Sequence, residues 1–226
     1  MRAILALAFI FCSSIALHAQ NSETRPFADF FEIRVSDGIE VELIKSDKPR
    51  IEIETEGVST DKVVTDLSSG RLRIRMRIGI YPGVYVKCKV YYSDLSLIQA
   101  MSAGIITSKE NFVVDRLSIS ANAGGSVNLH VEARRLSLES MAAGSISLTG
   151  SADLAMINAG TGGKIEAFKL MANEAEVRAN SGASVNVNVK DGLSGRSSTG
   201  AQINYKGSPP NLSVETQLGG TINRAY

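Results

Sequence analysis

Tryptophan is absent from this chain of 226 residues, and cysteine and histidine each occur only twice. Cys12 and His18 lie near the N-terminus, so Cys88 and His130 stand alone in the rest of the chain. One cysteine cannot form an intrachain disulfide, and one cysteine with one histidine does not supply a zinc site. A general base at His130 would need an orienting partner that the sequence does not indicate. The lack of tryptophan also removes the usual platform for stacking sugars.

A long hydrophobic run is missing except near the N-terminus. There, Arg2 and an apolar stretch over residues 3–16 precede a small-residue exit at Ala19, which is typical of a signal peptide. The stretch is shorter than the ~18 residues of a membrane span. We expect a signal peptide over 1–19 that is cleaved after Ala19, because the bulky phenylalanine before Cys12 makes a poor lipidation site. The mature chain is then exported without a membrane span, to the periplasm, the outer-membrane surface or the extracellular space.

Neither sign of charge dominates. Once Arg2 leaves with the signal, 23 basic residues remain beside 23 acidic ones, which gives no support for a nucleic-acid partner or an anionic membrane surface. Charge of one sign does gather locally, in an arginine series at 71, 73, 75 and 77 that alternates with apolar residues. Glu52, Glu54 and Glu56 have the same spacing and predict cross-strand ion pairs with that series. The alternative is an anion-binding face for sulfated or phosphorylated polymers.

The first part of the mature chain predicts strands. Residues 20–29 are polar and indicate a flexible leader, whereas residues 30–100 alternate in hydrophobicity and predict an antiparallel β region. Within it, residues 60–67 are the one helical or irregular candidate. Cys88 shares an apolar strand face, so we expect a buried small hydrophobe rather than a reactive thiol.

The second part repeats with a period of about 19 residues. A small residue recurs at Gly104, Gly125, Gly144, Gly163, Ala183, Ala201 and Gly220, and a β-branched residue always follows two positions later. A fixed period with a fixed apolar residue is the signature of a stacked solenoid. No coil has room for a helix of ten or more residues. The sequence therefore predicts an all-β fold whose residues 101–226 form a right-handed parallel β-solenoid of about seven coils.

The repeats also predict which side chains face inward. The first strand of each coil is expected to bury one column of Leu117, Leu136, Leu154, Ala175, Leu193 and Leu212, and a second of Ile119, Leu138, Met156, Val177, Gly195 and Val214. Glycines at the repeat marks and just before them are expected to provide corners with positive φ.

Two outward columns consist mainly of short polar residues. They predict a binding face of Ser126, Asn128, Ser145, Ser147, Ser184, Asn186, Gln202 and Asn204. Such residues in register can form a hydrogen-bonded ladder that is purely structural. They can equally form a flat face for a glycan or a protein.

Several stretches are similar to one known family. The segment Phe31-Glu32-Ile33-Arg34-Val35-Ser36-Asp37-Gly38 resembles the opening of the GIN domain, the head domain of auto-transporter adhesins found mainly in Bacteroidetes. The similarity continues through Gly70-Arg71-Leu72-Arg73-Ile74 and the recurring Ser102-Ala103-Gly104 motif, and covers about residues 27–207. The resemblance implies a β-helical envelope or secreted domain with an adhesin-like role. It brings no catalytic or binding residues with it.

Three functions follow, in order of preference. The first is a non-catalytic adhesin-like module that binds a glycan, a protein or a surface polymer through the flat polar face, without cofactor or metal. The second is a structural module that self-associates through the C-terminal coil around residues 212–222. The third is a carbohydrate-active enzyme, which the scatter of Glu132, Glu139 and Asp153 over different faces does not favour.

Overall fold

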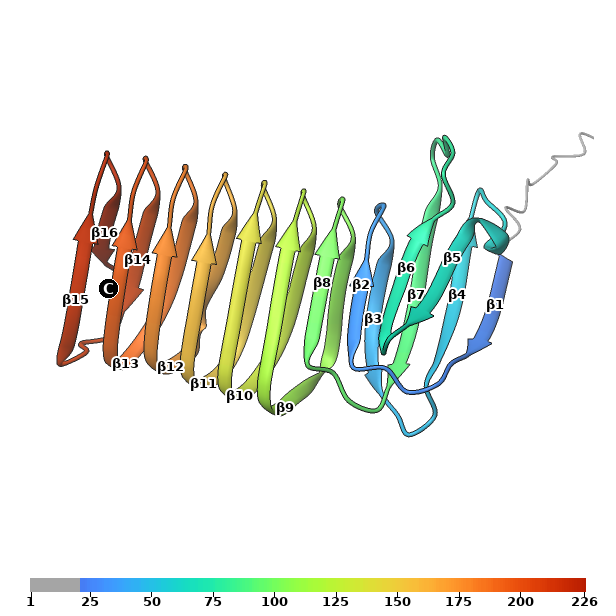
Figure 1. The fold of residues 1–226 in the computed structure, drawn as a ribbon, viewed down its shortest axis with the longest axis horizontal. Coiled ribbons are helices and arrows are strands. Elements are labelled where there is room, and N and C mark those ends of the chain that lie inside the picture. The colour runs from blue at the N-terminus through green and yellow to red at the C-terminus, as the bar shows by residue number, and fades with distance from the viewer. Residues whose placement is uncertain (1–20) are drawn as a thin grey trace, which may run out of the picture.

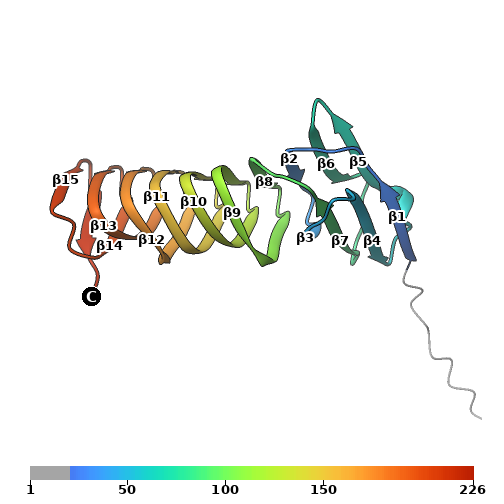
Figure 2. The same ribbon diagram turned by 90° about the horizontal axis from the view of Figure 1, so that it is seen from below.

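A computed structural model describes residues 21–226, and the expected signal peptide and its cleavage point lie outside these residues. The chain forms one elongated β-solenoid with a broader N-terminal end (Figures 1 and 2). Within the described part, the only helical segment is a 3-10 turn at Thr60–Lys62. The strands are β1 (Asn21–Pro26), β2 (Glu32–Val35), β3 (Glu40–Lys45), β4 (Arg50–Glu56), β5 (Val63–Ser68), β6 (Arg71–Met76), β7 (Tyr85–Tyr92), β8 (Leu97–Met101), β9 (Ile105–Asn122), β10 (Ser126–Met141), β11 (Ser145–Ala159), β12 (Lys164–Ala179), β13 (Ser184–Ser197), β14 (Gln202–Lys206), β15 (Asn211–Thr216) and β16 (Thr221–Arg224).

Each coil has two strand segments that enclose the core. A segment rises to a tight turn, a second descends from it, and the chain bends into the next coil (Figure 1). In Figure 1 the front segments rise, the rear ones descend and the chain advances to the left, which makes the coil right-handed. Neighbouring coils pair in parallel, so that Val127 lies beside Ile106 on one side and Ile146 on the other. The predicted all-β solenoid of about seven coils is confirmed.

The two segments form two walls. Wall A holds the descending segments, at residues 105–112, 126–133, 145–152, 164–172, 184–190, 202–206 and 221–224. Wall B holds the rising segments, at residues 97–101, 116–122, 135–141, 154–159, 174–179, 192–197 and 211–216. Alternation along each segment sends every second side chain into a shared core. The remaining side chains form the outer faces of the two walls.

The corners are stacked type I′ turns. In the turn at residues 122–125, Ala123 and Gly124 have φ of 50° and 75°, and the Gly125 N–H donates to the Asn122 carbonyl. The Gly124 N–H also donates to the carbonyl of Ala142 in the next turn. The turns thus form a hydrogen-bonded row along one edge of the molecule.

The expected role of the mark glycines is wrong, because positive φ falls on the two residues before each mark. The glycines at the marks are needed for close approach instead. A Cβ at Gly144 would lie 1.9 Å from the carbonyl oxygen of Ala121 in the preceding coil. At Ala183 and Ala201 the same column accepts a methyl group.

One pair of predicted core residues is wrong by one position. Leu154 is half-buried and Met156 is exposed, while Ala155 and Ile157 point into the core. The register agrees, since Leu136 pairs with Ala155 and Leu138 pairs with Ile157. Counted back from the mark at Gly163 as in the other coils, the core residue is Ala155. The repeat spacing therefore predicts the core residue better than side-chain size does.

The N-terminal region begins the solenoid rather than preceding it. Antiparallel pairs occur, as expected, between β1 and β4, β4 and β7, and β5 and β6. Parallel pairs also occur, since β2 lies between β6 and β8, and β3 lies between β7 and β9. The coil of β2 and β3 even has a turn of the same kind at residues 36–39. The irregular segment expected at 60–67 is a short 3-10 turn followed by β5.

Residues 21–26 form strand β1, which corrects the expected flexible leader. Arg25 fixes this strand across the end of the solenoid. Its guanidinium donates to the Val63 carbonyl at 2.7 Å, the Thr65 hydroxyl at 2.9 Å and the Thr60 carbonyl at 3.0 Å, and it pairs with Glu23 at 2.7 Å. β1 edges wall A and β5 edges wall B at this end, so Arg25 closes the core where the two walls would otherwise open.

The expected partners of the arginine series are also wrong. Arg71 pairs with Glu32, and Arg73 pairs with Asp66. Glu52 instead lies opposite Lys89, because β4 pairs with β7 rather than with β6. The arginines do form cross-strand ion pairs, but with residues of β2 and β5 rather than of β4.

Candidate functional site

The eight residues of the predicted binding face lie on the outer face of wall A. Ser126, Ser145, Ser184 and Gln202 fall in one column, which Lys164 continues. Asn128, Ser147, Asn186 and Asn204 fall in the neighbouring column, which Glu166 continues. The structure therefore brings the predicted residues together in two rows across five coils.

The C-terminal half of this face is a hydrogen-bonded ladder. The Asn186 amide donates to both Glu166 carboxylate oxygens at 2.9 and 2.8 Å, and the Asn204 amide donates to Asn186 at 2.8 Å. Gln202 donates to Asn204 at 3.1 Å, and Lys164 pairs with Glu166 at 3.3 Å. These side chains already satisfy one another.

The N-terminal half differs. Among the described residues, the side chains of Ser126, Asn128, Ser145 and Ser147 have no hydrogen-bond partner. Their donors and acceptors lie at the surface, where a ligand can reach them. The next outward position is occupied by a His130–Thr149 contact of 2.8 Å.

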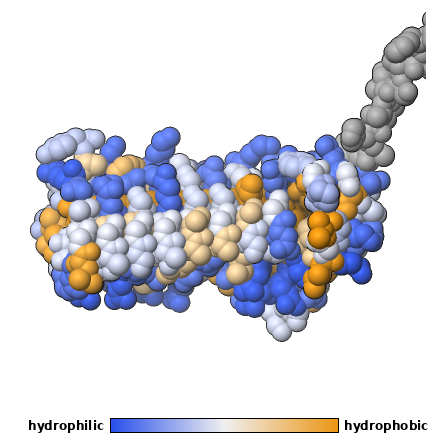
Figure 3. All heavy atoms as spheres, turned by 90° about the horizontal axis from the view of Figure 1, so that it is seen from above, coloured by the Kyte–Doolittle hydropathy of each residue, from blue (hydrophilic) through white to orange (hydrophobic). Residues whose placement is uncertain are grey.

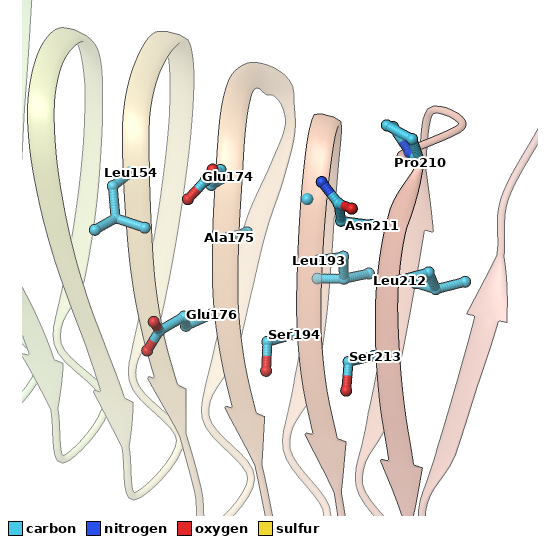
Figure 4. Close-up of a pocket in the computed structure, with 11 residues that line it drawn as sticks. Leu154, Glu174, Ala175, Glu176, Leu193, Ser194, Pro210, Asn211, Leu212 and Ser213 are labelled. Carbon is cyan, nitrogen blue, oxygen red and sulfur yellow. The ribbon is translucent and has the colours of Figure 1, made fainter.

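Wall B carries a groove that the sequence did not reveal. It has a volume of about 570 Å³ and lies over β11, β12, β13 and β15. Gly192 contributes no side chain to this face, so a gap remains between Glu174 of the preceding coil and Asn211 of the following coil. Figure 4 shows Glu174 and Glu176 on the same side of β12, both reaching toward β11. The groove residues are Leu154, Glu174, Ala175, Glu176, Gly192, Leu193, Ser194, Pro210, Asn211, Leu212 and Ser213.

The chemistry of this groove is mixed. Glu174 and Glu176 are exposed and have no ion-pair or hydrogen-bond partner among residues 21–226. Leu154 and the adjacent Met156, which is 41% exposed, add apolar surface. The assignment of Leu154 and Met156 to the core concealed this site. Counting coils from the glycine marks would have placed both residues outside.

Cys88 is the one free cysteine among residues 21–226, and it is buried. Burial raises the pKa of the Cys88 thiol to about 12, which keeps it protonated and agrees with its predicted role as a core residue. No group of three or more His, Cys, Asp or Glu residues that could hold a metal ion occurs among residues 21–226. Over the same residues, no helix is long and apolar enough to cross a membrane.

The fold and its two outer faces define a parallel β-solenoid domain whose polar walls are its main accessible surfaces. The chain belongs to the family described as "Putative auto-transporter adhesin, head GIN domain", whose model matches residues 29–209. The resemblance of the sequence to the GIN domain is thereby confirmed, and the family is adhesin-like by its description.

Solved structures share this fold. One is described as a "putative adhesin" from Bacteroides fragilis, with 21% identity, a TM-score of 0.77, and coverage of 92% of this chain and 99% of that one. A second "putative adhesin", from Parabacteroides merdae, has 18% identity, a TM-score of 0.74, and coverage of 92% and 96%. A third, from Parabacteroides distasonis, is described as a "Putative lipid binding protein", with 24% identity, a TM-score of 0.66, and coverage of 91% and 97%. No curated protein matches the chain significantly.

Proposed function

We propose that this chain is a non-catalytic, exported, adhesin-like module that binds a glycan, a protein or a surface polymer through an outer face of its solenoid. The observation that carries the proposal is the row of short polar side chains on wall A whose N-terminal half has no partner within the fold. Family membership supports the adhesin-like role.

The geometry suits an extended ligand. Coils stack about 4.8 Å apart, so equivalent hydroxyl and amide groups recur at that spacing across the wall. Short side chains lose little rotamer freedom when they bind, in contrast to lysine or glutamate. Ser126, Ser145 and Asn128 therefore offer a flat, pre-ordered surface to a chain that lies across the strands.

The groove on wall B is the competing location for the same function. Its unpaired carboxylates and its apolar patch at Leu154 would contact sugar hydroxyls and ring carbons, or a basic peptide. The two locations lie on opposite walls, so substitutions can separate them.

The test is a glycan array probed with the mature protein and two double variants. Ser145→Glu with Ser147→Glu places charge and bulk on wall A, and Glu174→Gln with Glu176→Gln removes the charge of the groove. We expect the mature protein to bind. The wall A variant should bind at least about tenfold more weakly, and the groove variant should keep its binding. The reverse pattern would move the site to wall B. An array without any hit, followed by failure to bind cell-surface protein or polymer extracts, would reject the binding function, and polysaccharide cleavage would replace it with an enzymatic one.

A second candidate function is self-association through the C-terminal coil. Its would-be core residues Leu212 and Val214 are each 46% exposed, and Leu218 at its turn is 81% exposed. Within residues 21–226, β15 pairs only with β13 and β16 only with β14, so both strands keep an open edge. Open edges of this kind pair with other strands unless charge or proline protects them. At the N-terminal end β1 and β5 likewise pair on one side each, but Arg25 bridges them and covers the core.

Light scattering across concentration tests this candidate. A twofold contact between two C-terminal coils would produce a dimer, which the Val214→Lys variant should convert to a monomer. Met156→Lys, on wall B away from the open edge, is the control and should leave the dimer intact. A mature protein that stays monomeric at every concentration would contradict self-association and leave the binding function untouched.

A further inference from the structure

The loop between β6 and β7 carries the two most exposed large aliphatic side chains among the described residues. Ile78 is 97% exposed and Ile80 is 95% exposed. They flank Gly79 in a short segment that Pro82 and Gly83 terminate before β7. In Figure 1 this loop rises higher than the row of coil turns beside it. Two isoleucines at a protruding tip are unfavourable in water, and the fold itself gives them no cover.

Basic groups stand at the base of the same loop. Arg75 and Arg77 are exposed, and neither forms an ion pair within residues 21–226. Of the acidic groups nearby, the Asp37 carboxylate accepts the Met76 N–H at 3.0 Å and keeps its charge, and Asp61 pairs with Lys62 at 2.9 Å. The tip therefore combines apolar side chains with two guanidiniums that form no ion pair within residues 21–226.

The surroundings decide what kind of partner fits. A specific protein interface needs about 800 Å² from each partner, and a tip with two isoleucines is far smaller. An interfacial lipid contact needs only a few apolar side chains together with attraction to anionic headgroups. Tyr81, half-buried beside the tip, is a residue that prefers the boundary between water and lipid.

In the part of the chain that the structure describes, the edge that bears the loop has no feature that would prevent it from lying against a flat bilayer. Its turn tips are small or uncharged, at residues 102–103, 123–124, 142–143, 161–162, 181–182, 199–200 and 218–219. Figure 3 looks onto this edge and shows a pale, weakly polar row along it, with hydrophobic surface over the N-terminal part. Leu218 ends the row at the opposite end of the molecule.

We propose that the β6–β7 loop docks onto an anionic lipid bilayer, with Ile78 and Ile80 in the interfacial layer and the Arg75 and Arg77 guanidiniums on lipid phosphates. The overall charge of the chain is balanced, so this attraction is local to the tip. The site lies away from the polar rows of wall A and the groove of wall B, and it does not depend on the proposed binding of a glycan, protein or polymer.

Vesicle sedimentation of the mature protein tests the proposal. The probes are vesicles of phosphatidylcholine alone and vesicles that also contain phosphatidylglycerol. We expect binding to the anionic vesicles, a loss of roughly tenfold or more in Ile78→Ser with Ile80→Ser, and a loss of about fivefold for each of Arg75→Gln and Arg77→Gln. Val113→Ser is the matched control, because Val113 is 68% exposed on another part of the chain.

A second measurement uses the absence of tryptophan from the chain. Ile80→Trp introduces a single indole at the tip, and its emission should shift to the blue when anionic vesicles are added. Val113→Trp should show no shift. The proposal would be overturned by absence of binding to anionic vesicles, or by an equal loss of binding in the Val113→Ser control. It would also be overturned if the indole emission did not shift although the protein sedimented with the vesicles. A protein partner whose binding requires both isoleucines, together with no binding to vesicles, would overturn it as well.

Discussion

At the scale of single residues, adjacent glycines in one turn meet different requirements. Gly162 has φ of 71° and free space at the position of a Cβ, whereas Gly163 lacks positive φ but has the Ser140 carbonyl oxygen 2.1 Å from the position of a Cβ. The first glycine relieves backbone strain, and the second permits close stacking of two coils.

This difference predicts unequal costs for two alanine substitutions. Gly162→Ala should cost about 1 kcal/mol, the penalty of a left-handed conformation. Gly163→Ala should cost more, about 2–3 kcal/mol, because the methyl group forces two coils apart. The cost stays limited, since Ala183 and Ala201 show that the column tolerates a methyl group where the spacing adjusts. Urea unfolding of both variants measures the difference, and equal midpoints would contradict the assignment.

Cys88 gives a second prediction at this scale. The thiol is fully buried and burial raises its pKa to about 12. The native protein at pH 8 should therefore not react with a disulfide reagent, while the urea-unfolded protein should release one equivalent. Because the folded pKa lies above the unfolded one, the related stability is complete below about pH 8.5 and declines as pH rises toward 12. Cys88→Ala is the control and should lack both effects. Rapid modification of the folded protein would show that the thiol is accessible.

At the scale of elements, the sequence predicted the strands and turns of the repeats well because each coil repeats the same local pattern. The prediction was wrong where the local sequence agreed equally well with two strand registers. Leu154 is more apolar than Ala155, so side-chain size suggested a register that is shifted by one residue. Strand partners outside the repeats could not be predicted, because alternation shows that Arg73 faces outward but not that Asp66 lies opposite.

The same limit applies to β1, whose polar sequence gave no sign of its partners. Its attachment depends on Arg25 and Glu23, and the hydrogen bond from Arg25 lowers the pKa of Glu23 to about 2. A lowered folded pKa means that this stabilisation is present above about pH 4.5 and is lost as pH falls toward 2.

We therefore expect β1 to detach in acid before the coils unfold. Protection of the amides of residues 21–25 against hydrogen exchange, measured relative to the intrinsic rate at each pH, should fall between pH 4 and 2, and Arg25→Gln should remove it at every pH. Glu23→Gln should remove the pH dependence. The pKa of Glu42 is also lowered, mainly by a hydrogen bond from Lys109, so overall stability declines in acid as well. Exchange confined to β1 distinguishes the two contributions, and a β1 that stays protected at pH 2 would contradict the prediction.

At the scale of the whole molecule, the arrangement of the outward residues could be predicted, while their role as a binding site stays a prediction. The eight outward residues of wall A were placed correctly by period alone, because a solenoid repeats outward positions as faithfully as inward ones. The ladder among Glu166, Asn186 and Asn204 could not be foreseen, since it depends on rotamers. The groove on wall B arises from a missing side chain at Gly192, which single-coil patterns do not reveal.

The solenoid is also quasi-one-dimensional, because each coil packs only on its two neighbours. Removing core volume should therefore have an effect that depends on position. Ile146 lies between Val127 and Ile165 in the middle of the stack, whereas Ile203 lies between Val185 and the partly buried Ile222 near the open end. Both side chains are completely buried, so each alanine substitution removes a similar local contribution of about 2–5 kcal/mol.

We expect Ile146→Ala to lower the global free energy of unfolding, and Ile203→Ala mainly to release the terminal coils. Hydrogen exchange followed coil by coil should show accelerated exchange confined to β14, β15 and β16 in Ile203→Ala, with β10 and β11 still protected. In Ile146→Ala the exchange should rise across the central coils, because opening there breaks contacts on both sides. Identical exchange profiles would show that the solenoid unfolds as one cooperative unit, in which the open C-terminal end is no weaker than the middle.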